Sequence, residues 1–596
     1  MSGIVGIVNL DGTTVNRQIL QHLTEFITYR GVDAQQVWHS GCVGFGNTLL
    51  RTTTESTKEH QPFTLDGTLW ITADARIDGR RDLLQKLNLD KQLPITDVEL
   101  ILRAYQLWGQ ECVHHLLGDF SFALWDSRKK SLFCARDQLG IKLFYYAHIG
   151  NSLIFSNTLK CLRQHPLVSQ ELNQQAIGDF LLFDQNYTAN TTAFAQIQRL
   201  QAAHTLTVFQ SRVKQQRYWQ LPVPDLIRYP KPEDYVSQFQ ELLQLAVIER
   251  LRTDKAAIFF SGGLDSTSIS SIASTSSQLQ GFTAVYDHLI PDQERYYSQL
   301  AATALGIPIT YLVEDDYQLY QGWQQPELHT PEPYHDPLCV MSYDQLQQIA
   351  TYSRIALNGQ GGDEALRTST VSQLRPGMNI VDLILDLGRC LWQHKLLPPL
   401  GSGILAQWRR WHRGVSDTDY YPQWLNPDFE ARLQLKERWR EINELERQAI
   451  HPLRPQAYQD LLSLRWQPFF ESYDSGFSHV PVEVRFPFLD LRLLNFLLAI
   501  PPLPWFVNKH ILRTAMQGKL PEEVRLRPKT PLMGDPFSVL IAKNQQLWQV
   551  LKQTPEIKAY VNTKLIIEAA TKGKIDAWQA WEFTRPVSLS NWLNYR

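Results

Sequence analysis

The chain has few cysteines and no apolar run long enough to cross a bilayer. Six cysteines occur among its 596 residues and no two form a CxxC pair, which argues against a disulfide framework and a zinc ribbon. The most apolar stretch, residues 493–507, contains an asparagine and three prolines and is shorter than the ~18–20 residues that a spanning helix needs. The N-terminus lacks the basic segment of a secretory signal. We therefore expect a cytoplasmic protein with reduced thiols.

An excess of one charge is also lacking. Lysine and arginine number 58, and aspartate and glutamate 60, so the net charge is −2. Nucleic-acid-binding proteins usually carry a basic excess, and we expect neither nucleic acid nor membrane as a partner. The 16 histidines include no pair at metal-ligand spacing with a third ligand. At roughly 150 residues per domain, a chain of this length with 43% hydrophobic residues predicts a multidomain enzyme.

Residues 1–210 are typical of a layered α+β domain built mainly from short strands. Apolar residues at helical spacing predict a helix over 98–107, after the start signal Thr96-Asp97. Strands far apart in the sequence, with helices between them, indicate stacked layers of sheet and helix. The predicted strands are 4–8, 44–50, 69–73, 121–125, 132–135 and 153–156.

Residues 211–232 are predicted to form a linker, because four prolines interrupt regular structure there. In the second domain, 233–596, strands at 256–260, 282–286, 309–313 and 355–358 alternate with helices. This alternation predicts a parallel sheet covered on both faces, an α/β fold. Beyond it the chain is helical and rich in tryptophan. Six tryptophans there either line a wide cleft or simply pack helices, which is the plainer interpretation: Trp392, Trp408, Trp411, Trp424, Trp439 and Trp466.

The strongest local signal is the segment FFSGGLDST at 259–267, between a predicted strand and a predicted helix. Gly262 and Gly263 permit close backbone approach, so that N–H groups of the turn and the helix start point at a polyphosphate. The lysine of GxxxxGK[ST] is missing, which excludes the P-loop of kinases and GTPases. An ordinary strand–turn–helix corner is the alternative. Side chains of the segment add hydroxyl donors and a carboxylate for Mg²⁺, namely Ser261, Ser266 and Asp265.

This loop resembles the pyrophosphate loop of the ATP pyrophosphatase superfamily, whose members split ATP into AMP and pyrophosphate. Lys529 falls where asparagine synthetases keep a pyrophosphate-binding lysine. The resemblance to that family implies an N-terminal glutamine amidotransferase-like domain of Ntn-type αββα layers and a C-terminal ATP-pyrophosphatase domain. The further segments that carry it, in order, are MSGI at 1–4, RDQLGIK at 136–142, NGQGGDE at 358–364, VRFPFLD at 484–490 and KHILR at 509–513.

The first domain departs from the family at its catalytic centre. The family nucleophile is an N-terminal cysteine, and Ser2 stands in its place with a much less nucleophilic hydroxyl. By position, Leu49 replaces the arginine that grips the glutamine carboxylate, and the segment Asp74-Ala75-Arg76 replaces Asn-Gly-Glu. Only Asp97 of that set remains. Because the charged partners of glutamine are lost, we predict that this domain does not hydrolyse glutamine.

The second departure is Gln360, where asparagine synthetases have a glutamate thought to handle the proton of ammonia. A glutamine cannot act as a base. What remains is a ligase that activates a carboxylate as an acyl-adenylate for attack by a supplied amine. Two branches of the family fit this description, enzymes that close a β-lactam ring and lasso peptide cyclases. The segment RPKTPL at 527–532 resembles the lasso branch more, which joins a side-chain carboxylate of a precursor peptide to its N-terminal amine. The alternatives are an asparagine synthetase, with ammonia or glutamine as donor, and a non-catalytic scaffold derived from such an enzyme.

The loop and the resemblance together imply a set of site roles. ATP phosphates lie on residues 261–266, and Mg²⁺ bridges Asp265 and Asp363. Lys529 neutralises the α-phosphate and the leaving pyrophosphate. The lasso branch also implies a peptide substrate, a precursor-binding protein and a leader peptidase. The remaining candidates are Phe259, Val285, Asn358 and Gly359 for adenosine, Gln360 at the amine-handling position, and Arg513 and Lys509 for the phosphate charge.

Overall fold

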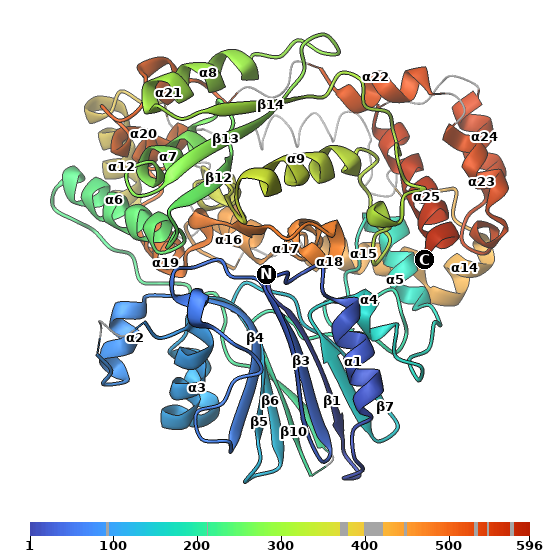
Figure 1. Cartoon of the computed structure of the whole chain (residues 1–596). Helices are drawn as coiled ribbons and strands as arrows, with labels where there is room; N and C mark the ends of the chain where they lie inside the picture. Colours follow the sequence, from blue (N-terminus) through green and yellow to red (C-terminus); the bar gives the residue numbers. More distant parts are fainter. Residues whose placement is uncertain are drawn as a thin grey trace.

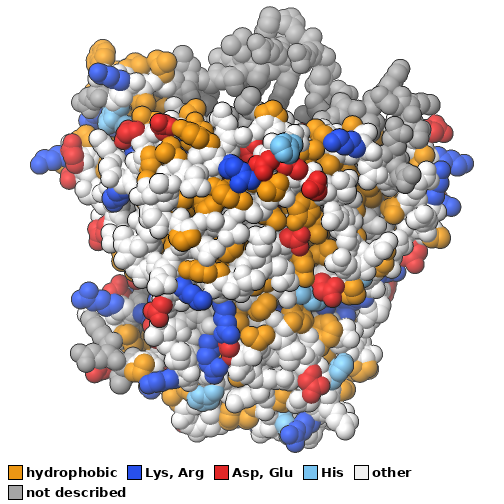
Figure 2. Space-filling model, turned by 45° about the horizontal axis from the view of Figure 1, so that its top comes forward, with side chains coloured by type: hydrophobic (Ala, Val, Ile, Leu, Met, Phe, Trp, Pro, Cys, Tyr) orange, Lys and Arg blue, Asp and Glu red, His pale blue; other side chains and the backbone are white. Residues whose placement is uncertain are grey.

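The computed structural model describes residues 1–90, 94–210, 212–369, 380–397, 421–445, 450–529, 534–544, 547–571 and 577–596. Two parts lie one above the other in Figure 1, antiparallel sheets below and a parallel sheet with most of the helices above. The N-terminus lies where the two parts meet, and the C-terminus lies beside the last helices. Charged side chains of both signs are interspersed over the face in Figure 2, as the near-zero net charge predicts.

The N-terminal part is the predicted αββα sandwich. One sheet has the order β2-β3-β1-β8-β7-β9, and the other has the order β11-β10-β6-β5-β4. Apolar side chains of both sheets form a core between them. The strands are β1 (Gly3–Asn9), β2 (Ala34–Ser40), β3 (Val43–Leu49), β4 (Leu69–Asp78), β5 (Leu117–Asp126), β6 (Ser131–Arg136), β7 (Tyr145–Ile149), β8 (Ser152–Ser156), β9 (Gln198–Arg199), β10 (His204–Phe209) and β11 (Arg212–Arg217).

Helices cover both outer faces of this sandwich. The predicted start of α3 is confirmed, because the Thr96 side chain accepts a hydrogen bond from the Glu99 N–H. Residues of α2 and α3 pack on the sheet that contains β5, and residues of α1, α4 and α5 pack on the sheet that contains β1. The helices are α1 (Arg17–Phe26), α2 (Arg80–Lys86), α3 (Asp97–Trp108), α4 (Leu159–Leu162) and α5 (Gln174–Phe183).

The C-terminal part contains the predicted parallel sheet, in the order β14-β13-β12-β15-β16. Four of its strands match the sequence prediction. The fifth, β16, was missed, because a strand of three residues carries too little periodicity to stand out. The carboxyl ends of parallel strands meet at one edge, where ligands of such sheets bind. The strands are β12 (Lys255–Phe259), β13 (Gln278–Val285), β14 (Ile309–Val313), β15 (Ile355–Leu357) and β16 (Glu483–Arg485).

Helices enclose this sheet and form the rest of the chain. Residues 212–217 of the predicted linker form β11, and α6 begins at Pro232. The helices are α6 (Pro232–Ile248), α7 (Leu264–Ala273), α8 (Glu294–Leu305), α9 (Cys339–Tyr352), α10 (Gly362–Ala365), α12 (Ile380–Gly388), α14 (Pro427–Leu433), α15 (Leu435–Leu445), α16 (Pro455–Leu462), α17 (Trp466–Tyr473), α18 (Ser475–Ser478), α19 (Leu491–Ala499), α20 (His510–Ala515), α21 (Glu522–Leu526), α22 (Pro536–Lys543), α23 (Val550–Gln553), α24 (Thr563–Thr571) and α25 (Ala577–Tyr595).

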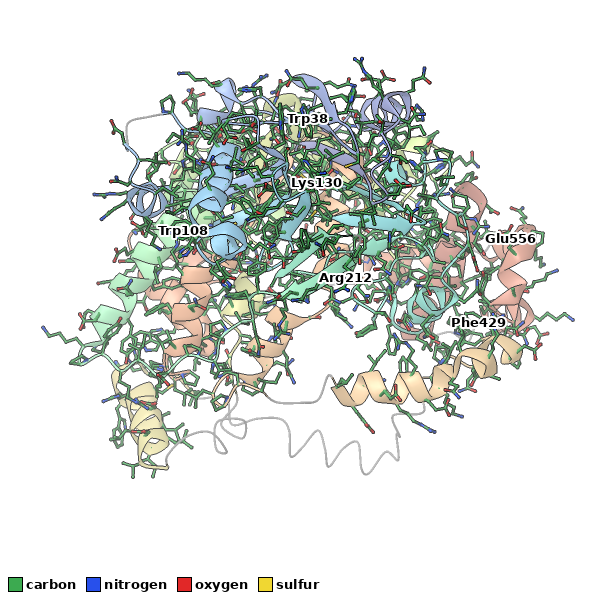
Figure 3. All side chains as sticks on the ribbon, turned by 90° about the horizontal axis from the view of Figure 1, so that it is seen from below. Trp38, Trp108, Lys130, Arg212, Phe429 and Glu556 are labelled. Atoms are coloured by element: carbon green, nitrogen blue, oxygen red, sulfur yellow. The ribbon has the colours of Figure 1, made fainter. Side chains whose placement is uncertain are left out.

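The last helices pack against the N-terminal sandwich as well as against each other. One hydrophobic core joins the β1 sheet and α5 to α14 and α25. From below, Trp38, Trp108, Lys130 and Arg212 lie over the sandwich, while Phe429 and Glu556 lie over the C-terminal helices (Figure 3). None of the described helices is long and apolar enough to cross a membrane.

The tryptophans of the C-terminal part mostly pack helices. Trp424 is buried, Trp439 stacks on Phe183, and Trp466 stacks on Phe470. Trp392 is 85% exposed. Helix packing, the plainer of the two interpretations, is therefore confirmed for these three tryptophans, and cleft lining does not hold for them. The other two, Trp408 and Trp411, lie outside the described residues, as do the last three residues of the segment at 527–532.

Candidate active site at the edge of the parallel sheet

The predicted phosphate loop joins β12 to α7 at the carboxyl edge of the sheet. Its serines hold its shape, because the hydroxyls of Ser261 and Ser266 lie 2.8 Å apart and Gly263 N–H donates to Ser261 Oγ at 3.2 Å. A Cβ atom on Gly262 would lie 2.3 Å from Tyr297 Cβ. Glycine therefore fits there, and a larger residue would have to displace Tyr297.

A carboxylate and a guanidinium next to this loop were not predicted. Gly262 N–H donates to Glu294 Oε1 at 2.7 Å, and Glu294 Oε2 pairs with Arg527 at 3.1 Å. The Arg527 guanidinium also lies 4.0 Å from the centroid of the Tyr297 ring. Arg527 stands two residues before Lys529, which was the one available sequence signal. Glu294 opens a helix and gives no such signal.

Two lysines and two aspartates meet beside the loop, although they come from four separate segments. Lys509 Nζ donates to Asp265 Oδ2 and lies 2.7 Å from Asp363 Oδ1. Lys529 Nζ lies 2.7 Å from Asp363 Oδ2. Sequence reasoning ranked Lys509 below Lys529, yet Lys509 is the residue that bridges both carboxylates. This group of four is called the lysine–aspartate cluster below.

Burial and charge act against each other in the cluster. Burial raises the pKa of Asp265, although Lys509 opposes the shift. The pKa of Asp363 is lowered: partial burial acts to raise it, and the charges of Lys509 and Lys529 outweigh that effect. The two aspartates raise the pKa of Lys509 despite its burial. Lys509 therefore stays charged at neutral pH.

The cluster has the donor atoms that Mg²⁺ prefers. Asp265 Oδ1 is buried and accepts no hydrogen bond from any described residue. Magnesium in proteins is usually bound through one or two carboxylates, with substrate phosphates and water completing its shell. Asp265 and Asp363 therefore fit a magnesium ion that arrives with a nucleotide. No group of three or more potential metal ligands exists among the described residues.

The second predicted loop, between β15 and α10, packs directly on the first. Added Cβ atoms on Gly359 and Gly362 would lie 3.1 Å from Ser266 N and 2.8 Å from Asp265 Cγ. Asn358 Oδ1 accepts a hydrogen bond from the Gln360 N–H at 2.8 Å, which fixes the turn. The glycines therefore bring the two loops together.

Gln360 is connected to a carboxylate within the same loop. Its Nε2 donates to Glu364 Oε1 at 3.0 Å. Burial raises the pKa of Glu364, and its other oxygen has no partner among the described residues. Glu364 was not singled out from the sequence, although it stands four residues after Gln360.

The predicted adenosine contacts lie at the ends of neighbouring strands. Val285 ends β13 and is buried, and Phe259 ends β12. The Phe259 ring meets the Tyr473 ring edge to face, with centroids 5.5 Å apart. Tyr473 also hydrogen-bonds the Asn358 side chain. Through these contacts of Tyr473, α17 packs on the ends of β12 and β15.

Arg513 is held by backbone oxygen atoms. Its guanidinium donates to the carbonyl groups of Asn508, Arg525 and Arg527, the last at 2.8 Å. These bonds fix the turn that leads to Lys529. We therefore assign Arg513 to positioning this turn rather than to direct contact with phosphate.

The region around Ser2 is closed by the chain's own polar groups. Ser2 is buried, its N–H donates to Asp74 Oδ1 at 3.1 Å, and its hydroxyl accepts from Leu50 N–H at 3.2 Å. Lys142 Nζ lies 3.1 Å from the same Asp74 oxygen, and Arg30 lies 3.7 Å from the other. The carboxylate of Asp74 is therefore already neutralised within the protein.

The other residues of the predicted glutamine pocket also offer no free charge. Arg76 is fully buried between Asp78 and Asp119, at 2.9 and 2.6 Å. Asp97, the retained residue, pairs with Arg252 of the C-terminal part at 2.7 Å. Leu49 is buried without a charge to offer.

Restoring the nucleophile alone is expected to leave glutamine hydrolysis at background. In a Ser2→Cys variant the Asp74–Lys142 pair and the buried Arg76 remain, so the substrate's charged groups still find no free partners. Glutamate release from glutamine measures this directly. Mass spectrometry must first show that Met1 has been removed. Glutamate release above that of the unmodified chain would contradict the prediction.

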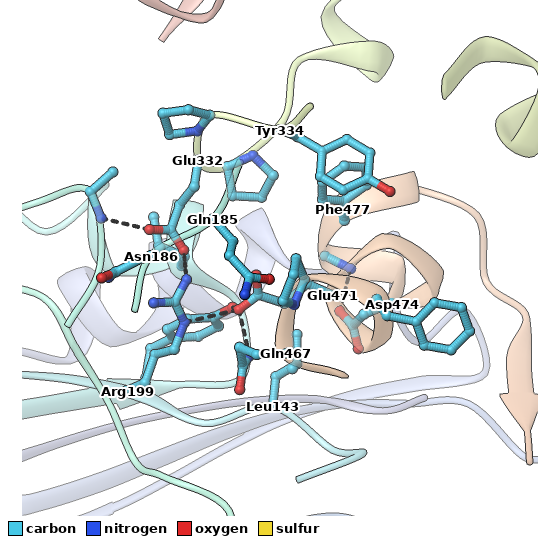
Figure 4. A pocket seen from close by; sticks show the side chains of 18 of the residues that line it. Leu143, Gln185, Asn186, Arg199, Glu332, Tyr334, Gln467, Glu471, Asp474 and Phe477 are labelled. Carbon is cyan, nitrogen blue, oxygen red and sulfur yellow. Dashed lines mark hydrogen bonds and ion pairs between the residues drawn. The ribbon is translucent and has the colours of Figure 1, made fainter. Parts of the chain in front are cut away.

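A cavity of about 270 Å³ lies between the two parts of the chain. Tyr145 and Gln185 line it from the N-terminal part, and Glu332 and Glu471 line it from the other (Figure 4). Arg199 lies between the two glutamates, paired with Glu332 and 2.9 Å from Glu471 Oε1. Two buried carboxylates thus share one guanidinium.

Glu332 makes the stability of the fold depend on pH. Its burial, with Glu471 nearby, raises its pKa from 4.5 to about 7. Its contribution is therefore fully present below pH 4.5 and is lost as the pH rises through 7. We expect the Tm of Glu332→Gln minus the Tm of the unmodified chain to be about 1–3 °C higher at pH 8 than at pH 5. A Tm difference that is the same at both pH values would contradict this.

Comparison with known proteins bears on both parts. Residues 1–219 match the glutamine amidotransferase domain, and residues 238–594 match asparagine synthase. Asparagine synthetase [glutamine-hydrolyzing] 3 of Bacillus subtilis is 25% identical over 89% of this chain and 86% of its own length. Asparagine synthetase [glutamine-hydrolyzing] 2 of the same organism is 26% identical over 89% of this chain and 71% of its own.

A fungal relative has a different name. Amidase chyE of Penicillium rubens is 24% identical over 93% of this chain and 90% of its own length. Proteins of this architecture therefore carry more than one activity name. The asparagine synthase match spans more than half of the chain and contains the β12–α7 and β15–α10 loops and the lysine–aspartate cluster. The chain thus belongs to the asparagine synthetase family and is an ATP-dependent amide-bond ligase.

Proposed function

We propose that this ligase adenylates a side-chain carboxylate of a peptide and joins it to the peptide's own N-terminal amine, closing a macrolactam ring as lasso peptide cyclases do. The observation that carries the proposal is the closed region around Ser2, where Lys142 and Arg30 already pair with Asp74. A ligase that makes no ammonia from glutamine needs an amine from elsewhere. A peptide terminus is such an amine.

The reaction divides into two balanced steps. A carboxylate oxygen attacks the α-phosphorus of ATP, an O–P bond forms, and pyrophosphate leaves. The amine nitrogen then attacks the acyl carbon, an N–C bond forms, AMP leaves, and one proton is released. The first step develops negative charge on phosphate oxygens, so it is favoured by fixed positive groups.

Residues of the two loops and of the lysine–aspartate cluster have distinct roles in these two steps. The N–H groups of Ser261, Gly262 and Gly263 are bonded within the protein, so the N–H groups that open α7, at 264–266, hold the phosphate oxygens. Lys509 and Lys529 offset the charge of the leaving pyrophosphate. Asp265 and Asp363 would hold Mg²⁺, which would supply positive charge against the phosphates. Gln360 orients the amine or acyl group by hydrogen bonding, and Glu364 behind it has a raised pKa that suits a proton acceptor.

The hypothesis of a peptide substrate implies partner proteins. A precursor-binding protein would present the peptide, and a leader peptidase would free its N-terminal amine. Both are proposals that rest on the resemblance to lasso systems.

Asparagine formation is the second candidate, and the names of the Bacillus relatives favour it. With the region around Ser2 closed, ammonia would have to come from solution. The chain would then be an ammonia-dependent asparagine synthetase.

Synthetic peptides test the cyclase proposal. Peptides encoded by short reading frames beside the gene, with a free N-terminus and an internal aspartate or glutamate, are incubated with the protein, ATP and Mg²⁺. We expect stoichiometric AMP and a product lighter by one water. The same peptide with an acetylated N-terminus is the control and should give no ring. Asparagine from aspartate and ammonium, with no peptide product, would favour the second candidate.

A further inference from the structure

We propose that the cavity between the two parts of the chain binds the N-terminal residue of a peptide, with its ammonium group on Glu471 and its first carbonyl oxygen on Gln185. The proposal rests on the proposed function, because it names where the amine substrate is held. It goes beyond that function by naming residues outside the nucleotide loops.

The first observation is an unfinished hydrogen-bond pattern on Glu471. Three donors meet on its Oε1: Tyr145 Oη at 2.7 Å, Arg199 Nε at 2.9 Å and Gln467 Nε2 at 2.6 Å. Among the residues that the structure describes, none bonds to its Oε2, and the side chain keeps 13% exposure. One carboxylate oxygen is therefore fixed while the other is free for a ligand that donates.

The second observation is the charge of the surrounding group. Glu332 and Glu471 share the single positive charge of Arg199, so the three side chains are left with one excess negative charge when ionised. Other charges in the lining cancel: Asp474 pairs with the buried Arg30 at 2.9 Å, and Asp184 and Arg465 contribute one charge of each sign. An excess buried negative charge favours a cation. The raised pKa of Glu332 is consistent with this excess.

The third observation is an unpaired donor aimed into the same space. Gln185 is only 6% exposed, and its Nε2 has no hydrogen-bond partner among the described residues. Figure 4 shows its amide pointing toward Glu471 across the cavity. A buried donor without a partner costs free energy, and a ligand carbonyl oxygen would satisfy it. An ammonium group followed by a carbonyl is the chemistry of a peptide N-terminus.

The cavity also stands in the right place for the reaction. Helix α17 contributes Gln467, Phe469 and Glu471 to its lining, and its last residue, Tyr473, contacts Phe259. The Phe469 and Tyr473 rings are in contact, with centroids 5.1 Å apart. Helix α17 thus connects the cavity to the side chains that pack on the end of β12.

Glycinamide is the probe, because it carries both an ammonium and a carbonyl and needs neither ATP nor an acyl substrate. Titration calorimetry on the full chain at pH 7.5 should detect glycinamide binding and no binding of N-acetylglycinamide. We expect Glu471→Gln to weaken the binding at least tenfold and Gln185→Leu to weaken it several-fold. The control Glu556→Gln makes the same change at an exposed glutamate outside the cavity, so its effect should stay below threefold.

Equal binding of glycinamide and its acetylated analogue would overturn the proposal, as would unchanged affinity in Glu471→Gln. If that variant does not fold, Glu332→Gln removes the same excess charge and should weaken binding as well. ATP–pyrophosphate exchange with candidate peptides is a separate measurement. Its failure would refute the cyclase function, whereas failure of glycinamide binding with exchange intact would refute only the amine site.

Discussion

Asp265→Asn is expected to reduce ATP–pyrophosphate exchange by at least about 1,000-fold while the protein stays folded. The substitution keeps the size of the side chain. It removes the charge that pairs with Lys509 and the carboxylate that would hold Mg²⁺. Burial already raises the pKa of this carboxyl, so its ionised form is not what stabilises the fold. Loss of activity without loss of Tm is the expected pattern.

A matched substitution separates this effect from a general one. Asp344→Asn makes the same change on α9, where Asp344 accepts a hydrogen bond from Tyr317, outside the two loops. We expect that variant to retain exchange within a factor of two or so of the unmodified chain. Normal exchange in Asp265→Asn would refute the assignment of the metal and phosphate site.

Lys529→Met is expected to lower AMP formation by about 100- to 1,000-fold, the range found when one charged or donor group at a reacting centre is removed. The Lys529 side chain is 77% exposed and forms an ion pair with Asp363 at 2.7 Å. An exposed ion pair contributes little to stability, so the Tm should move by no more than about 1 °C.

Two variants control for charge and for position. Lys519→Met removes another exposed lysine from the same part of the chain and should leave the rate unchanged. Lys529→Arg keeps the charge and should recover part of the activity. An equal loss in Lys519→Met, or no loss in Lys529→Met, would mean that Lys529 does not act on the phosphates.

Much of the fold could be predicted from the sequence because its signals are local. The glycine-rich turn after a buried strand located the phosphate loop, and Thr96 located the start of α3. Strand β16 escaped because it has three residues. The order of the sheets could not be derived, since it depends on pairing between distant segments.

The parts of the site that were missed are contacts between distant residues. Lys509 reaches Asp265 across 244 positions, and Glu294 reaches Arg527 across 233. Nothing in the sequence near Glu294 marks it as part of a site, and Lys509, a candidate by resemblance, could not be paired with Asp265 from the sequence. Glu471, which meets Arg199 in the cavity, is a third case. The family resemblance identified the motifs, whereas the pairing of these charged side chains depends on the folded structure.

The closed first domain still has a structural task. Glu483 of β16 lies 3.6 Å from both the Met1 amino group and Lys142, and 3.8 Å from Arg76. Burial acts to raise the pKa of Glu483, but Arg485 first and then these charges lower it well below its usual value. The polar groups near Ser2 thus tie the two parts together.

The most direct test supplies the protein with Mg²⁺, ATP and aspartate, together with either glutamine or excess ammonium, and follows asparagine, glutamate and AMP by mass spectrometry. We predict no asparagine and no glutamate from glutamine, because Asp74 beside Ser2 is already paired with Lys142 and Arg30. Asparagine made from glutamine would contradict both the closed first domain and the peptide amine that replaces ammonia.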